Sequence, residues 1–190
     1  LLEAMENGSI SIDGQARSLG DPFFVLATRN PIEFHGTYPV PEAALDRFLV
    51  RTELGYPIAD RELELYQGRS PLEELSTLAP IVQRSDLQAL RQASNAIEVR
   101  EAVARYALRV VHATREDRRI QLGASPRAAL AWLAAARAEA LLDGRSYVLP
   151  DDLQSTASCV LEHRMCMHGG TSDTTGVVLR ELLERTPVEL

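Results

Sequence analysis

The spacing of apolar and polar residues predicts strands in the first part of the chain and helices in the rest. Residues 9–12 and 15–19 flank an Asp-Gly pair at 13–14, which is typical of a tight hairpin because both turn positions take positive φ. Residues 23–28 are a short apolar segment rich in aromatic and branched side chains. This composition predicts a strand that is buried on both faces. A second strand is predicted over residues 48–54.

Elsewhere, apolar residues recur at helical spacing. Ser85 and Ser125 can each cap a helix N-terminus, the second with proline at the first helical position. Gly144 suits the position just past a helix end. Helices are predicted over residues 41–46, 60–67, 85–96, 100–115, 126–143, 150–165 and 175–185. We therefore predict an α/β part over residues 1–69, followed by an all-α part over residues 70–190.

Composition narrows the possible functions. All 20 basic residues are arginine and the formal net charge is −7, which matches a nucleic-acid backbone poorly. No apolar run is long enough to cross a bilayer, and two cysteines make no disulfide framework. We therefore expect a cytoplasmic protein that binds no nucleic acid and does not insert into a membrane. The opening residues are typical of the middle of a helix rather than of a signal peptide, so we expect the chain to be part of a longer protein.

Asn30 is the first candidate for chemistry, because it follows the predicted strand at residues 23–28. Ligands of open α/β sheets bind outside the carboxyl ends of the strands. A neutral amide there can hold a water against a phosphate, because it both donates and accepts hydrogen bonds. By itself, the dipeptide Asn30-Pro31 is more typical of an ordinary turn.

Two arginines are further candidates. Arg47 lies between a predicted helix and a predicted strand, where a guanidinium can stabilise charge on a transferring phosphoryl group. The alternative is a surface ion pair with Asp46 or Glu42, and Arg51 is a lesser rival four residues on. Arg127 lies in the first turn of a capped helix, where a cation opposes the helix dipole. It either meets an anion there or is simply solvated.

Longer strings carry a family resemblance. Residues 27–33 (ATRNPIE), 36–43 (GTYPVPEA) and 45–48 (LDRF) closely resemble the MoxR-type AAA+ ATPases, and the last two strings together are highly specific. The opening LLEAM is similar to the helix after that family's Walker B strand, and ASPRA at 124–128 resembles its sensor 2 motif. The resemblance extends to about Arg164. It implies the C-terminal portion of a P-loop AAA+ α/β core with a β-hairpin insert, followed by a small helical lid domain.

Roles for the three candidates follow from the resemblance. It implies that Asn30 is sensor 1, which orients the attacking water or the γ-phosphate. Arg47 would be the arginine finger that reaches the ATP of a neighbouring subunit, and Arg127 would be sensor 2 on the lid of its own subunit. ATP and Mg2+ would be bound. The family implies a hexameric ring that remodels or activates client protein complexes, often with a partner that carries a von Willebrand A domain.

The sequence departs from the family in one respect, since it has no Gly-rich loop with lysine and no acidic Walker B pair. ATP and Mg2+ would therefore need a preceding phosphate-binding region, and we expect this chain by itself to be inactive. Two rival interpretations stay open: a non-catalytic scaffold, and a DNA-binding transcriptional regulator that uses the helical half. A magnesium-chelatase-like ATPase is a closely related alternative, but the string at residues 36–42 favours the MoxR type.

Cysteine and histidine residues near residue 160 are the last candidates. Cys159, His163 and Cys166 would share one helix face if the helix extended that far, and His168 follows them. Their spacing matches no standard zinc motif, so we predict no metal site there.

Overall fold

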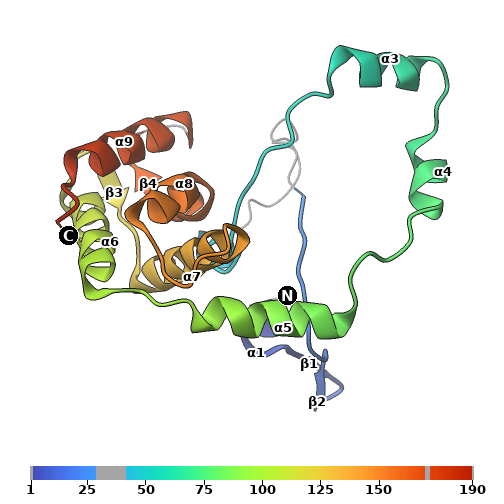
Figure 1. Ribbon diagram of the computed structural model, residues 1–190, viewed down its shortest axis with the longest axis horizontal. Helices are drawn as coiled ribbons and strands as arrows, with labels where there is room; N and C mark the ends of the chain where they lie inside the picture. Colours follow the sequence, from blue (N-terminus) through green and yellow to red (C-terminus); the bar gives the residue numbers. More distant parts are fainter. Residues whose placement is uncertain (1, 29–41, 170–171, 190) are drawn as a thin grey trace.

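The computed structural model describes residues 2–28, 42–169 and 172–189, and Figure 1 shows their arrangement. In these residues the strands form two separate two-stranded sheets, and helices make up most of the remainder. The elements in chain order are α1 (Leu2–Asn7), β1 (Ser9–Ile12), β2 (Gln15–Ser18), α2 (Glu42–Leu45), α3 (Ala59–Tyr66), α4 (Pro71–Ser76), α5 (Arg84–Ala96), α6 (Glu101–Glu116), β3 (Ile120–Leu122), α7 (Pro126–Leu142), α8 (Pro150–Leu161), the 3-10 helix η1 (Glu162–Arg164), β4 (Cys166–Met167) and α9 (Ser172–Arg185).

β1 and β2 form the hairpin that the sequence predicts. They pair antiparallel, with Ser9 opposite Ser18. The turn residues Asp13 and Gly14 have positive φ, at 52° and 76°, which is the geometry that an Asp-Gly pair favours. The prediction of this hairpin is confirmed.

The two further strands predicted in the first part of the chain are wrong. Neither residues 23–28 nor residues 48–54 form a strand in the part of the chain that the structure describes. A strand needs a neighbouring strand for its backbone hydrogen bonds, and none pairs with either segment among these residues. Phe24 and Leu26 are consequently 78% and 90% exposed.

The predicted helices are confirmed, with changes at their ends. The helix predicted over residues 150–165 ends at Leu161 and continues as η1. Ser85 is not the N-cap of α5, because Gln83 holds that position and its backbone amide donates to Asp86 Oδ2 at 2.7 Å. The short elements α4, β3 and β4 were not predicted.

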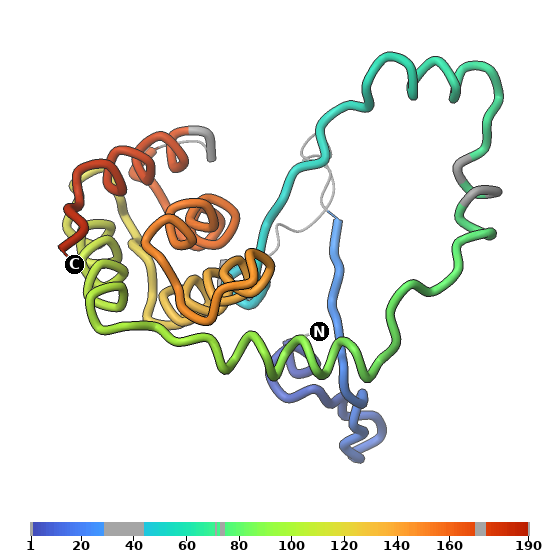
Figure 2. The backbone as a smooth tube through the Cα atoms, viewed as in Figure 1, coloured from blue at the N-terminus to red at the C-terminus, as the bar shows by residue number. Residues whose placement is uncertain are grey.

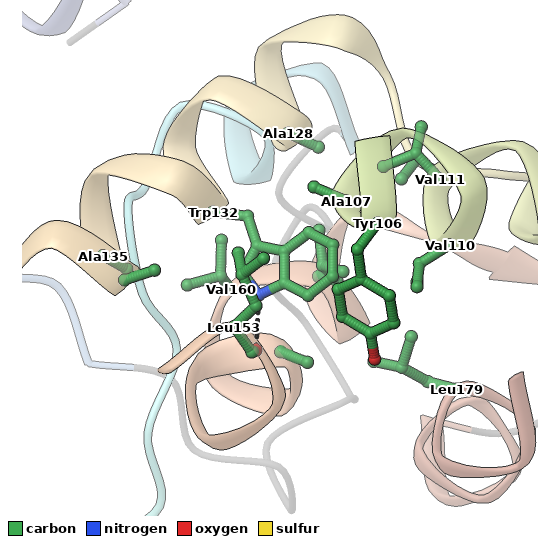
Figure 3. Packing of buried hydrophobic residues seen from close by; sticks show 14 of the residues in the cluster. Tyr106, Ala107, Val110, Val111, Ala128, Trp132, Ala135, Leu153, Val160 and Leu179 are labelled. Atoms are coloured by element: carbon green, nitrogen blue, oxygen red, sulfur yellow. Dashed lines mark hydrogen bonds between the residues drawn. The ribbon is translucent and has the colours of Figure 1, made fainter. Parts of the chain in front are cut away.

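An apolar cluster holds α6, α7, α8 and α9 together. Trp132 projects from α7 into its centre beside Tyr106 of α6, and both are completely buried (Figure 3). The indole Nε1 donates to the carbonyl oxygen of Leu153 in α8 at 2.7 Å, so its polar atom is satisfied. Small side chains on α7 allow the neighbouring helices to approach closely. The buried alanines of this helix are Ala128, Ala135, Ala136 and Ala140.

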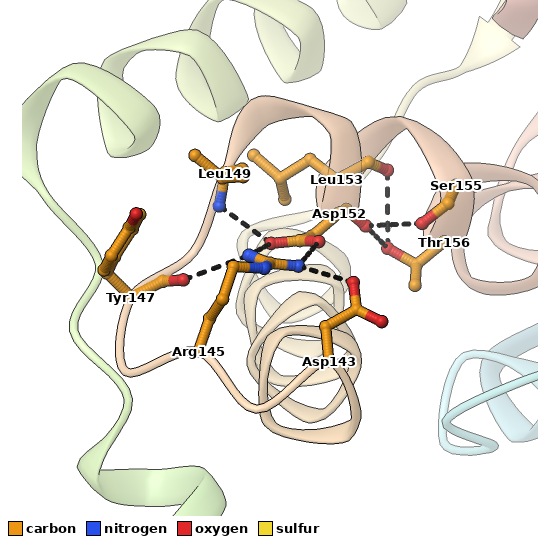
Figure 4. Close-up of polar contacts among 8 residues, drawn as sticks. All are labelled: Asp143, Arg145, Tyr147, Leu149, Asp152, Leu153, Ser155 and Thr156. Atoms are coloured by element: carbon orange, nitrogen blue, oxygen red, sulfur yellow. Dashed lines mark hydrogen bonds and ion pairs between the residues drawn. The ribbon is translucent and has the colours of Figure 1, made fainter.

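A shielded ion pair holds the turn between α7 and α8 (Figure 4). Arg145 donates to both carboxylate oxygens of Asp152, at 2.7 and 2.5 Å, and the Leu149 amide donates to the same carboxylate at 2.7 Å. Burial alone would raise the pKa of Asp152, but these hydrogen bonds outweigh it and lower that pKa. Gly144 has a φ of 72° just past α7, as the sequence predicts.

The chain from residue 52 to α5 runs as a long arc outside the apolar cluster, and Figure 2 follows its course. α5 contacts α7, whereas α3 has no buried residue. Tyr56 and Ile81 on this arc are 95% and 96% exposed. The earlier part of the chain also meets the helical part at residues 46–51, beside the candidate site.

Candidate functional site

Arg47 lies just after α2 and reaches back to α1. Its Nε and Nη2 both donate to Oε1 of Glu6, at 2.9 and 2.5 Å, and its side chain is 20% exposed. The alternative interpretation of the sequence expected a partner at Asp46 or Glu42, and the structure adds a carboxylate from another element, Glu6 of α1. An ion pair partly shielded from water is stronger than an exposed one, so Glu6 helps to hold Arg47 in place.

Arg127 approaches the same carboxylate from the helical part of the chain. It is the second residue of α7, whose predicted N-cap Ser125 accepts the Ala128 amide at 3.1 Å. Nη2 of Arg127 lies 3.9 Å from Oε1 of Glu6, and its side chain is 54% exposed. Glu6 therefore faces both candidate arginines and supplies an anion near the positive end of α7.

These groups line one pocket with a volume of about 350 Å³. Its charged lining consists of three arginines, Arg47, Arg127 and Arg164, and two carboxylates, Glu6 and Asp46. Three guanidinium groups against two carboxylates leave one formal positive charge in excess. A concave site with that balance suits an anionic ligand.

Asn30 lies outside the residues that the structure describes, so its role stays a prediction. Arg51, the rival of Arg47, is described: its Nη2 pairs with Glu53 at 2.8 Å, and its side chain is 45% exposed. An ion pair this exposed is worth little, and Arg51 does not line the pocket. The geometry therefore favours Arg47 over Arg51.

The segment that carries Arg47 docks on the end of α8 through backbone groups. Arg164 in η1 has a side chain only 2% exposed, and its Nε pairs with the carboxylate of Asp46 at 3.2 Å. The same guanidinium donates to the carbonyl oxygens of Asp46, at 3.2 and 3.3 Å, of Leu49, at 3.1 Å, and of Phe48. Beside it, Nε2 of His163 lies 3.0 Å from the Phe48 carbonyl oxygen.

Burial lowers the pKa of both His163 and Arg164, because removal from water disfavours the charged form. The hydrogen bond to Phe48 opposes this effect in His163, and the carboxylate of Asp46 opposes it in Arg164. Arginine remains charged at neutral pH even so, whereas His163 is neutral there. The buried cation of Arg164, which lines the pocket, therefore lies beside the neutral imidazole of His163.

Two of the cysteine and histidine candidates near the end of α8 make contacts of another kind. His163 is engaged by Phe48, and Sγ of Cys159 donates to the Thr156 carbonyl oxygen at 3.3 Å. Burial also raises the pKa of the Cys159 thiol. Over residues 2–28, 42–169 and 172–189, no three His, Cys, Asp or Glu side chains are placed to hold a metal ion. In the same residues no helix has the length and apolarity to cross a membrane.

Sequence reasoning did not single out Glu6 or Arg164 for this site. Glu6 is one acidic residue among many, and its contact with Arg47 joins positions 41 residues apart. Arg164 makes contacts that join positions up to 118 residues apart. The one feature of the sequence that pointed towards Arg164 was the family resemblance, which extends to about this residue. The resemblance did not assign a role to its side chain.

Two family models match the chain on either side of the arc. One, described as an ATPase family associated with various cellular activities, matches residues 1–50. The other, described as an AAA lid domain, matches residues 112–181. The first range includes Glu6 and Arg47, and the second includes Arg127 and Arg164.

Individual relatives agree with these matches. Over 168 residues the chain is 44% identical to the uncharacterized protein YeaC of Bacillus subtilis. The matched region covers 88% of this chain and 52% of that protein. It is 39% identical over 178 residues to the chaperone MoxR1 of Mycobacterium tuberculosis, covering 88% of this chain and 46% of that one. The crystal structure of a candidate ATPase from Cytophaga hutchinsonii matches the whole chain with a TM-score of 0.84 and 31% identity, and the chain covers 61% of it. The chain spans about half the length of the curated relatives it matches.

Proposed function

The chain belongs to the MoxR-type AAA+ ATPases, and on that basis we propose that it is part of an ATP-hydrolysing, chaperone-like machine that remodels or activates client protein complexes. Its fold is the C-terminal portion of an AAA+ core with a hairpin insert, followed by a helical lid. The chaperone name of one relative supports the proposed activity.

The observation that carries the proposal is the meeting of Arg47 and Arg127 at one pocket, against Glu6. We assign Arg47 as the arginine finger, Arg127 as sensor 2 and Asn30 as sensor 1. Phosphoryl transfer depends on positioning and on charge stabilisation, which two guanidinium groups can provide. To reach the ATP of a neighbouring subunit, Arg47 would leave Glu6, and a phosphate competes well with a carboxylate for an arginine fork.

The arginines of the pocket suit phosphate groups, and the described residues offer little for the rest of an ATP site. Arg47 could meet phosphate oxygens of a neighbouring subunit's ATP, and Arg127 those of its own subunit's ATP. A P-loop lysine would normally cradle the phosphates, and the sequence contains no lysine. The described residues also hold no group of three candidate metal ligands for Mg2+. Binding of ATP and Mg2+ would therefore rely on a preceding P-loop region of a longer parent protein, and we expect this chain by itself to be inactive.

The assembly proposed for the parent is a hexameric cytoplasmic ring. Splitting the site between subunits would make hydrolysis depend on ring formation, because the finger and the P-loop then belong to different chains. The expected partners are a protein with a von Willebrand A domain and the client complex. No contact with nucleic acid is expected.

Mixed rings of the full-length parent test this proposal. One subunit type carries Arg47→Ala and the other a disabled P-loop, and ATP hydrolysis is measured for each alone and for the mixture. Each alone should lose activity on the order of 10³-fold, which is the scale of an arginine finger. Mixing should restore activity, because an intact P-loop then meets an intact Arg47 across an interface.

Arg51→Ala is the matched control, because Arg51 lies in the same segment and outside the pocket. It should keep nearly full activity. If Arg47→Ala keeps full activity instead, the finger assignment is wrong and Arg51 becomes the next candidate. If the unaltered parent hydrolyses no ATP at high protein concentration, the scaffold interpretation gains support.

A further inference from the structure

Arg164 is a buried arginine whose hydrogen bonds are directed at backbone oxygens of the segment that carries Arg47. Its side chain is 2% exposed, and its guanidinium donates to the carbonyl oxygens of Asp46, Phe48 and Leu49. These residues lie on both sides of Arg47. The planar fork of a guanidinium suits such a set of acceptors, whereas a lysine ammonium is a single point charge without the fork.

Two neighbouring hydrogen bonds attach the same segment. Nε2 of His163 lies 3.0 Å from the Phe48 carbonyl oxygen, and the backbone amide of Arg51 donates to the Cys159 carbonyl oxygen at 2.8 Å. On the lid side, these contacts come from α8 and η1, within the range that matches the lid domain. The segment after α2 is thus attached to the lid at several successive positions.

Packing alone does not account for an arginine at this position. Removing a guanidinium from water costs several kcal/mol, and apolar residues of similar volume often replace buried ion pairs without loss of stability. Among the described residues Arg164 has one carboxylate partner, Asp46, and its other donors are used on carbonyl oxygens of the Arg47 segment and of Val160 in α8. A residue with this distribution of bonds determines where the segment lies.

We propose that Arg164 is a positioning residue that holds Arg47 at the subunit interface by fixing the backbone of residues 46–49 to the lid. This inference rests on the proposed role of Arg47 as a finger for the neighbouring ATP. It implies that a movement of α8 also moves Arg47. A subunit altered at Arg164 should therefore lose more as a donor of the finger than as the owner of an ATP site.

Mixed rings of the full-length parent separate these two roles. In the donor arrangement, Arg164→Lys is placed in the subunit with the disabled P-loop, whose Arg47 serves the neighbour. In the acceptor arrangement, Arg164→Lys is placed in the Arg47→Ala subunit, which uses only its own P-loop. We expect hydrolysis in the donor arrangement to fall at least tenfold relative to mixed rings with unaltered Arg164. In the acceptor arrangement, where the altered subunit supplies no finger, the fold-loss should be at least threefold smaller than in the donor arrangement.

An equal loss in both arrangements would show a general structural role and overturn the inference, while leaving the proposed function intact. Unchanged activity in both would overturn it as well. If mixed rings with unaltered Arg164 restore no hydrolysis, the proposed function itself fails and the inference fails with it. Should Arg164→Lys subunits not assemble, His163→Leu in the same arrangements provides the test, because leucine has no donor for the Phe48 carbonyl oxygen and leaves no buried charge. A loss confined to the donor arrangement supports the inference, and an equal loss or no loss contradicts it.

Discussion

The helical part of the chain and the part before it differ in how their apolar side chains are covered. The buried members of the apolar cluster extend from Ile97 to Leu182. Among the described residues before that range, the buried apolar side chains are those of Ala4 and Ala44. Leu54, by contrast, is 96% exposed. Full burial of one leucine side chain stabilises a fold by about 1.5–3 kcal/mol, so the two parts differ greatly in the stability that they can generate themselves.

Backbone hydrogen bonding explains part of this difference, although the helices α3 to α5 also lie before Ile97. A helix satisfies most of its backbone groups within its own segment, whereas a strand requires another strand beside it. α6 to α9 therefore form a core from local elements that pack on one another. Residues 23–28 and 48–54 have the composition of buried strands but no paired strand among the described residues.

The largest expected effect is the loss of the side chain at the centre of the apolar cluster. Trp132→Ala should lower the free energy of unfolding by about 3–5 kcal/mol, because it opens a cavity and removes the hydrogen bond to Leu153. Phe24→Ala, at a side chain that is 78% exposed, should change it by less than about 0.5 kcal/mol. Urea unfolding of the chain, followed by circular dichroism, measures both. Similar losses in the two variants would refute the contrast between the parts.

A smaller effect is expected at the ion pair between α7 and α8. Arg145→Met leaves the shielded Asp152 carboxylate without its main partner, so it should lower the free energy of unfolding by less than Trp132→Ala but by more than the loss of an exposed ion pair. The matched control is Arg105→Met, which removes an exposed pair with Glu101 and should cost about 0.3–0.5 kcal/mol. The same unfolding measurement ranks them. Equal costs would mean that shielding from water does not strengthen the Arg145 pair.

The smallest effect is expected from pH, at the junction between the two parts. Burial lowers the pKa of His163 below its ordinary value of 6.5, with partial opposition from the hydrogen bond to Phe48. Between the folded and unfolded pKa values the unfolded chain binds more protons. The contribution to stability is therefore full above about pH 6.5 and is lost as the pH falls towards the folded pKa.

The free energy of unfolding should accordingly decrease as the pH is lowered from about 7 to about 5. His163→Gln removes the titrating group, so it should flatten that decrease while lowering stability at neutral pH. Unfolding curves at a series of pH values give the slope for both proteins. An identical slope in the variant would assign the pH dependence to other groups.

Sequence reasoning succeeded where the determining contacts are local. The Asp-Gly turn and the Ser125 cap depend on residues within a few positions, and both are confirmed. Ser85 shows the limit of such reasoning, because the N-cap of α5 is Gln83, two residues before the most obvious candidate, with Asp86 as its partner. The strand predictions failed because a strand is defined by its partners as much as by its own composition.

By itself, the sequence determined the hairpin, the main helices, the family and the choice of Arg47 and Arg127 as candidates, since these depend on short-range pattern and on motifs. Only the tertiary structure decided that both arginines face Glu6, and that Arg164 grips the backbone beside Arg47. Those contacts join positions 41 to about 120 residues apart. Their geometry depends on how α1, α7 and α8 pack, and no local pattern of residues encodes the distance between groups on separate elements.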